Sequence, residues 1–198
     1  MNLIPNQETG KQYDHVETVV YTQEIEAKKK YKSSCNKLLQ ISNWGTIGDS
    51  ILKTEFCLCN KQGNEISSVP EVGDYIRIDL SGPGSKSGEG YDWVSIEEVV
   101  KEDNQKEHEF TSIKVRPAAC PLNNNETIAH FFDAAATSTF IVTRNGNEVS
   151  AQIHGRNEEP NKHTHLATDN VRNTVVAKFA AVKFSDIQWT SLCKGFIA

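Results

Sequence analysis

Hydrophobic and polar positions alternate most regularly along residues 137–154, on either side of an Asn145-Gly146 dipeptide. Asparagine and glycine tolerate positive φ, so this dipeptide predicts a type I′ turn and a β-hairpin. In that register Val142 lies opposite Val149, with one face of the hairpin apolar and the other mostly polar. A turn one position later, at Gly146-Asn147, changes the partners but leaves each residue on the same face. The facing is therefore predicted, while the register stays open.

Two-residue alternation predicts further strands along the chain. We expect them at residues 15–22, 51–59, 75–80, 92–100 and 110–116. From Gln23 to Ile41 the apolar spacing becomes helical, which predicts one or two helices ending near Gly45.

The C-terminal residues again have helical spacing. Asp169 or Asn170 can cap a helix whose apolar side would face the core through Val171, Val175, Val176, Phe179 and Ala180. Ser185-Asp186 can begin its continuation, so we expect one kinked helix or two helices in series. Residues 126–136 fit either a short helix or a loop.

This order predicts one α+β domain over residues 1–198, with an antiparallel sheet of about six or seven strands, an N-terminal helical segment and a long C-terminal helix. Residues 1–14 are expected to be a polar tail, and residues 117–136 an insertion between strands. The order of elements resembles the helix-grip fold of the START-like, or SRPBCC, superfamily. That resemblance implies a curved sheet wrapped around the C-terminal helix, with an apolar or aromatic small molecule bound in the cavity between them.

Composition excludes several classes of protein. A net charge of -5 argues against nucleic-acid binding, which needs a basic surface. No apolar run approaches the roughly 20 residues that cross a bilayer. The N-terminus lacks the basic and apolar regions of a secretory signal, and the five scattered cysteines suit reduced thiols, so a cytoplasmic location is expected. Cys57 and Cys59 are interpreted as small buried hydrophobes.

The apolar side of the predicted hairpin and a nearby aromatic segment are candidate ligand contacts. Adjacent aromatic rings beside a histidine suit a pocket that holds an apolar molecule and fixes it with one polar group. The candidates are His130, Phe131, Phe132, Phe140, Val142, Ile153 and Trp93. An ordinary core position is the alternative for each aromatic side chain. The hypothesis predicts a cavity of roughly 300 to 1,000 Å³.

His154, Arg156 and Glu158 are candidate catalytic residues because they stand at every second position at the end of a predicted strand. An extended backbone would point all three the same way, and they could then bind an anion or transfer protons. Asp92 could add a carboxylate. In the alternative, Arg156 and Glu158 pair with each other and anchor the following linker.

Two other patterns are weaker candidates for a binding site. The glycine-rich loop 82–90 lacks Walker spacing and a following helix, so it is interpreted as a hairpin connection and not a phosphate site. His163 and His165 lie in a polar linker, and we expect no metal and no cofactor. The sequence thus favours a protein that binds an apolar small molecule. A cyclase- or hydrolase-like enzyme and a protein-interaction module remain as alternatives.

Overall fold

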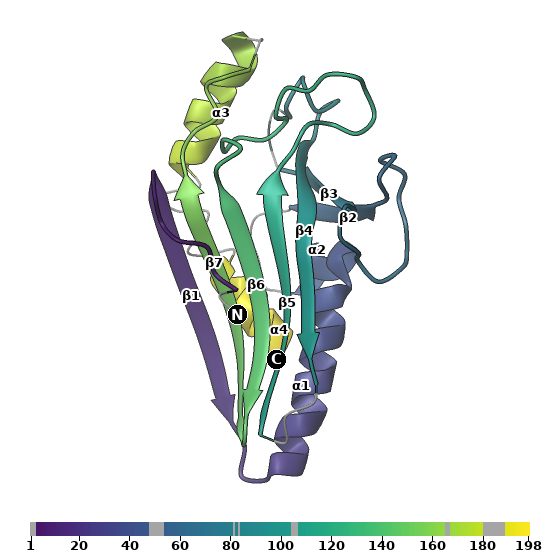
Figure 1. Cartoon of the computed structure of the whole chain (residues 1–198), viewed down its shortest axis with the longest axis vertical. Helices are drawn as coiled ribbons and strands as arrows, with labels where there is room; N and C mark the ends of the chain where they lie inside the picture. The colour runs from purple at the N-terminus through teal and green to yellow at the C-terminus, as the bar shows by residue number, and fades with distance from the viewer. Residues whose placement is uncertain are drawn as a thin grey trace.

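The computed structural model describes residues 3–47, 54–80, 82, 84–103, 107–164, 167–179 and 189–198, with side chains of 177–179 left aside. Its centre is an antiparallel sheet with strand order β1-β7-β6-β5-β4-β3-β2 (Figure 1). The strands are β1 (Lys11–Val20), β2 (Glu55–Cys59), β3 (Tyr75–Asp79), β4 (Asp92–Glu102), β5 (His108–Pro117), β6 (Thr137–Asn145) and β7 (Glu148–Glu158). The expected α+β class and strand number are confirmed.

Helices cover one face of this sheet, which we call the inner face. They are α1 (Glu24–Leu39), the 3-10 turn η1 (Ile41–Asn43), α2 (Trp44–Ile47) and α4 (Thr190–Ile197), whereas α3 (Ala167–Phe179) lies beyond the strands (Figure 1). Helix α1 packs on β6 and β7, and α4 packs on β1, β7 and α1. Between them, the Trp44 ring lies 4.6 Å from the Phe140 ring and 5.8 Å from that of Phe196, which joins helices and sheet in one core. No helix of the described residues is long and apolar enough to span a membrane.

The hairpin of β6 and β7 forms with its predicted facing but in the later register. Asn145 pairs with Glu148, so the loop is Gly146-Asn147. Gly146 has φ +58°, whereas Asn147 is not among the residues with positive φ. Positive φ at only the first loop position is the pattern of a type II′ turn, not of the predicted type I′ turn. Because the later turn shifts the pairing by two residues, so that Val142 lies opposite Ala151 and not Val149, the apolar face still points to the core.

Strand β1 starts earlier than expected. It begins at Lys11, so residues 11–14 belong to the sheet and not to a polar tail. The predicted strand at 51–59 is seen as β2, and its first three residues lie outside the described part of the chain. Residues 126–136 form a loop tied down by short bridges, such as that between Ala119 and Ile128, and not a helix.

The two C-terminal helices differ in how they are packed. Helix α4 presents buried Leu192 and Phe196 to the core. Helix α3 lies at one end of the molecule, beyond the strands (Figure 1), and its facing reverses the prediction. Val171 is 67% exposed, whereas Asp169 and Asn173 are buried. The reason is its neighbour: α3 rests on polar loops and not on the apolar sheet face. The predicted start at Ser185-Asp186, and Ala180, lie outside the described residues.

Candidate functional site

An apolar pocket opens between the inner face of the sheet and the helices. Its volume is about 70 Å³, so the predicted cavity of roughly 300 to 1,000 Å³ is not found between the described parts of the sheet and the helices. Apolar side chains from several elements form most of its wall, among them Trp44, Phe56, Ile76, Val94, Phe140 and Trp189. Its polar members include His130, Thr54 and Glu158. The pocket thus joins the β2 edge of the sheet to β7 near the opposite edge.

Four of the seven predicted ligand contacts line this pocket. They are His130, Phe131, Phe132 and Phe140. Val142 and Ile153 are instead packed in the core on the same face of the sheet. Trp93 lies in a separate cluster with Cys59, Cys120 and Ala129, where its Nε1–H donates to the Gly88 carbonyl oxygen at 2.9 Å.

Glu158 reaches the pocket because the end of β7 is irregular. On β1, Lys11 and Tyr13 are two residues apart, but their partners Glu158 and Gly155 are three apart. The extra residue makes a β-bulge, and Asn157 there has φ +57°. The bulge reverses the alternation after Arg156, so Glu158 turns to the inner face while His154 and Arg156 remain on the outer face.

The Glu158 carboxyl lies in an environment that disfavours its charge. Burial raises its pKa from the ordinary 4.5 to about 7, and the charges of Arg156 and Lys11 oppose this only in part. Among the described residues, no side chain or backbone group forms a hydrogen bond with the carboxyl. Near neutral pH it is therefore able both to donate a proton and to accept one.

His130 is the second polar group of the pocket. Its Nδ1 accepts a hydrogen bond from the backbone N–H of Phe132 at 3.0 Å, so the neutral ring carries its proton on Nε2. The ring stacks on Phe131 with 4.2 Å between centroids. Burial lowers the pKa of His130 to about 4, the Asp92 carboxylate raises it and Arg172 lowers it further. His130 is thus a neutral hydrogen-bond donor.

Thr54 was not singled out by the sequence. It precedes β2 and shares the inward facing of Phe56 and Leu58, since side chains two apart in a strand share a face. It is only 3% exposed, and its hydroxyl has no hydrogen-bond partner in the part of the chain that the structure describes. Trp44 and Trp189 also escaped prediction as pocket residues, because helical spacing explains them equally well as core.

His154 and Arg156 do not join Glu158. On the outer face, His154 Nδ1 lies 2.5 Å from Asp14 Oδ1, and Arg156 donates to the same oxygen at 2.7 Å. The Asp14 pKa is lowered: burial raises it, but the hydrogen bonds and charges of His154 and Arg156 outweigh burial. These two candidates therefore anchor β7 to β1, and the predicted His/Arg/Glu cluster is divided between the two faces of the sheet.

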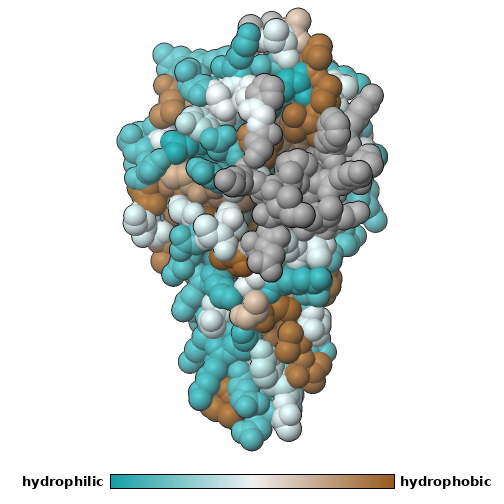
Figure 2. Space-filling view, turned by 180° about the vertical axis from the view of Figure 1, so that it is seen from behind, coloured by the Kyte–Doolittle hydropathy of each residue, from teal (hydrophilic) through white to brown (hydrophobic). Residues whose placement is uncertain are grey.

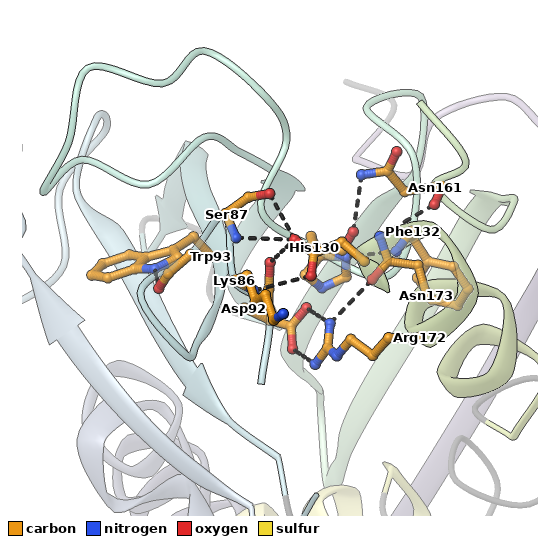
Figure 3. Close-up of polar contacts among 12 residues, drawn as sticks. Lys86, Ser87, Asp92, Trp93, His130, Phe132, Asn161, Arg172 and Asn173 are labelled. Carbon is orange, nitrogen blue, oxygen red and sulfur yellow. Dashed lines mark hydrogen bonds and ion pairs between the residues drawn. The ribbon is translucent and has the colours of Figure 1, made fainter. Parts of the chain in front are cut away.

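Asp92 forms a buried ion pair with Arg172 of α3, shown in Figure 3. The guanidinium contacts both carboxylate oxygens, at 2.9 Å and 2.5 Å, and the side chains are 1% and 8% exposed. Arg172 also donates to Asn173 Oδ1 at 3.2 Å, and Asn173 donates to the Asn161 carbonyl oxygen at 3.2 Å. This polar cluster holds α3 to the body of the protein, so Asp92 is structural and not at the pocket mouth.

The glycine-rich loop binds an anion that belongs to the protein itself. The Asp169 carboxylate, near the start of α3, accepts from the backbone N–H groups of Lys86 at 3.1 Å and Ser87 at 2.9 Å, and from the Ser87 hydroxyl at 2.7 Å (Figure 3). Burial raises the Asp169 pKa, but these hydrogen bonds prevail and lower it. Consecutive N–H groups of this kind form the concavity that suits phosphate. Here Asp169 fills it.

The remaining candidates for metal or thiol chemistry lie apart from the pocket. Cys57 Sγ and Cys59 Sγ are 4.0 Å apart, and burial raises the pKa of both thiols, that of Cys57 to about 12. All five cysteines are free. Among the described residues no group of three potential ligands could hold a metal. His163 is exposed, and His165 lies outside the described residues.

Comparisons with known proteins give similarity to solved structures only. No family model and no curated protein matches the sequence. A protein from Arthrobacter aurescens is similar with 9% identity and a TM-score of 0.40, over 92% of this chain and 85% of the other. Major latex-like protein 151 of Panax ginseng has 12% identity and a TM-score of 0.37, over 92% and 99% of the two chains. Norcoclaurine synthase of Thalictrum flavum has 10% identity and a TM-score of 0.33, over 90% and 98%.

Similarity at these identities and TM-scores assigns no family. The START-like resemblance inferred from the order of elements therefore stays a prediction, and the function is argued from the pocket itself.

Proposed function

We propose that this protein binds a small, mostly apolar molecule that carries one hydrogen-bonding group, in the pocket between the inner face and the helices. The proposal rests on the Glu158 carboxyl. This group lies among apolar side chains, and no described residue forms a hydrogen bond with it. Burying a carboxyl without a partner costs free energy. Such a group is commonly retained where a ligand or reaction uses it.

Two further groups support this proposal. The Thr54 hydroxyl is buried and has no hydrogen-bond partner among the described residues, and the His130 ring offers its Nε2–H as a donor. The wall thus presents donors and an acceptor on an otherwise apolar surface, the usual composition of a small-molecule site. A ligand carbonyl, hydroxyl or phenol could accept from protonated Glu158, while the aromatic rings bury the remainder of the molecule.

The size of the pocket sets a condition on binding. At about 70 Å³ it holds a few water molecules and no drug-sized ligand, so side chains must move for a larger molecule to enter. Phe131 and Phe132 are suited to move because they are half-buried and lie in a loop, whereas Phe140 is fixed in the central strand β6. We therefore expect ligand binding to move the Phe131 and Phe132 rings, because the backbone here is held by the Phe132–Pro160 bridge and the Asn161 N–H bond to the Phe131 carbonyl oxygen.

Apolar surface elsewhere gives less support to a protein-interaction module. On the face shown in Figure 2, hydrophobic areas are separate, with hydrophilic residues between them. Contiguous patches are the usual mark of a docking surface. The free cysteines agree with a reducing compartment, so we propose that the ligand is bound in the cytoplasm.

Native mass spectrometry of freshly purified protein, before and after denaturing extraction, tests this function. We expect a small molecule to co-purify with the protein. The fraction of protein that carries it should be smaller in Glu158→Gln. Glu159→Gln is the matched control, because Glu159 is the adjacent glutamate and its carboxylate bonds to Thr9 instead. If neither an extracted molecule nor a panel of small phenols and aromatic ketones binds, the proposed function is wrong.

An acid–base enzyme is the second candidate function, favoured by the pKa of about 7 for Glu158 in the same pocket as His130. General acid–base groups work best when their pKa lies near the operating pH. The two functions differ in what happens to the ligand. An enzyme converts the extracted molecule, with a rate that Glu158→Gln abolishes, whereas a binding protein returns it unchanged.

A further inference from the structure

The side chains from His154 to Glu159 are bound to the N-terminal part of the chain, except that of Glu158, whose backbone pairs with Lys11. His154 and Arg156 bond to Asp14, and Glu159 accepts a hydrogen bond from Thr9. Gly155 has no side chain, and Asn157 bonds to residues 6–9. Every other side chain of this stretch is thus held by residues 6–14, and only the Glu158 carboxyl is left to the pocket.

Residues 6–9 surround the Asn157 side chain and backbone. Asn157 Oδ1 accepts from the backbone N–H groups of Glu8 at 2.7 Å and Thr9 at 3.1 Å. Asn157 Nδ2 donates to the Asn6 carbonyl oxygen at 3.3 Å, and the Asn157 backbone N–H donates to Gln7 Oε1 at 3.0 Å. Four hydrogen bonds therefore join this one residue to a segment about 150 positions away. We call residues 6–9 the clasp.

These bonds act on the residue whose backbone sets the bulge. A left-handed conformation is uncommon outside glycine, and asparagine is among the residues that adopt it most readily. At Asn157 it is the step that turns the next side chain inward. With regular extended geometry, Glu158 would return to the face of His154 and Arg156, because side chains two apart share a face.

We propose that the clasp controls the pocket: by holding Asn157 in its left-handed conformation, residues 6–9 keep the Glu158 carboxyl on the inner face, and release of the clasp withdraws it. The ligand-binding consequence rests on the proposed function, while the effect on Glu158 does not. Asn157 and Gln7 are accordingly positioning residues.

The test measures the Glu158 carboxyl directly, by ¹³C NMR titration of the full chain. Asn157→Ala removes the clasp bonds of the side chain and disfavours positive φ. Asn157→Gly removes the same bonds but permits that φ. We expect the Glu158 pKa to fall from about 7 toward the ordinary 4.5, further in the alanine variant than in the glycine variant.

Two other variants complete the design. Gln7→Ala removes the acceptor for the Asn157 N–H and the Gln7 Nε2 bonds to the Thr9 and Gly10 carbonyl oxygens, but it leaves the Asn157 side-chain bonds in place. A smaller fall is therefore expected, and this variant serves if Asn157→Ala does not fold. Asn60→Ala is the matched control: Asn60 also accepts backbone bonds, from Gln62 and Asn64, but follows β2 at the opposite edge of the sheet. Its Glu158 pKa should equal that of the unaltered protein.

A Glu158 pKa that stays near 7 in the folded Asn157 and Gln7 variants would overturn the clasp. Binding of the extracted or panel ligand is measured separately on the same samples. If both ligand binding and the Glu158 pKa are unchanged in these variants, the clasp proposal is wrong and the proposed function still holds. If the Glu158 pKa falls but neither the unaltered protein nor any variant binds a ligand, the proposed function is wrong and the clasp proposal still holds.

Discussion

The carboxyl of Glu158 occupies the space that a side chain at Gly155 would take. A Cβ at position 155 would lie 2.2 Å from Glu158 Oε1 and 2.9 Å from its Cδ. These distances are far below van der Waals contact, so the Glu158 carboxyl can take this position only because residue 155 is glycine. The bulge at Asn157 turns Glu158 inward, and Gly155 provides the room that receives it.

Gly155→Ala should expel the carboxyl without unfolding the strand. Position 155 has no positive φ, and Tyr13 Cβ, the next neighbour, would lie at 3.4 Å from the new methyl group. The flexible end of Glu158 therefore yields first. We expect its pKa to fall toward 4.5 in a ¹³C NMR titration.

A Glu158→Ala background provides the control for that substitution. There the new methyl group meets no carboxyl, so Gly155→Ala should change the thermal midpoint less than it does in the unaltered protein. Equal changes in the two backgrounds would show that Gly155 is needed for another reason.

Glu158→Gln should stabilise the protein at high pH. A carboxyl whose folded pKa is raised from 4.5 to about 7 favours folding less as pH rises through that interval, because the unfolded chain ionises first. Above pH 7 the ionised Glu158 carboxyl lowers the free energy of unfolding by about 3 kcal/mol. Urea unfolding at pH 8 should therefore show the variant to be more stable, with the glutamine advantage fading toward pH 4. Glu159→Gln should lack this pH dependence.

His130 should remain neutral across the physiological range. Its pKa of about 4 and the Phe132 N–H bond to Nδ1 predict the Nε2–H tautomer. Long-range ¹H–¹⁵N correlation spectra should show that tautomer unchanged between pH 8 and 5.5, with the signal assigned by its loss in His130→Gln. Protonation of His130 within that range would contradict the burial that we describe.

Asp92→Asn should loosen α3 selectively. It removes the Asp92 charge from the buried ion pair with the Arg172 guanidinium, and breaking a buried pair from one side typically costs about 3 to 5 kcal/mol. Hydrogen exchange should quicken most in α3 and in residues 85–88, which α3 holds through Asp169, and least in α1. Asp103→Asn is the matched control, since Asp103 forms an exposed pair with Lys101 and should cost less than about 1 kcal/mol. Equal acceleration throughout the chain would argue against a separate attachment of α3.

Local patterns determined the parts of this fold that depend on local geometry. Alternation predicted the inward face of β6 and β7, because neighbouring side chains in a strand must point to opposite sides. Phe140 consequently lies on the pocket wall as expected. The turn composition narrowed the hairpin to two registers but did not choose between them, since both keep the apolar residues inside.

Helical periodicity predicted the existence of α3 but not its orientation. The spacing of Val171 and Val175 favoured an apolar contact, whereas Arg172 and Asp169 instead found partners at Asp92 and Ser87. Those partners are about 80 residues away, and no local pattern indicates them.

The sequence by itself determined the α+β class and the hairpin facing, and it offered the aromatic segment as a candidate for the pocket wall. Only the tertiary structure decided which carboxyl enters that pocket. Extended geometry placed Glu158 with His154 and Arg156, and the left-handed Asn157, held by Gln7 and its neighbours, reversed it. A backbone conformation that is costly alone persists when distant groups hydrogen-bond to it, and such contacts exist only once the chain has folded.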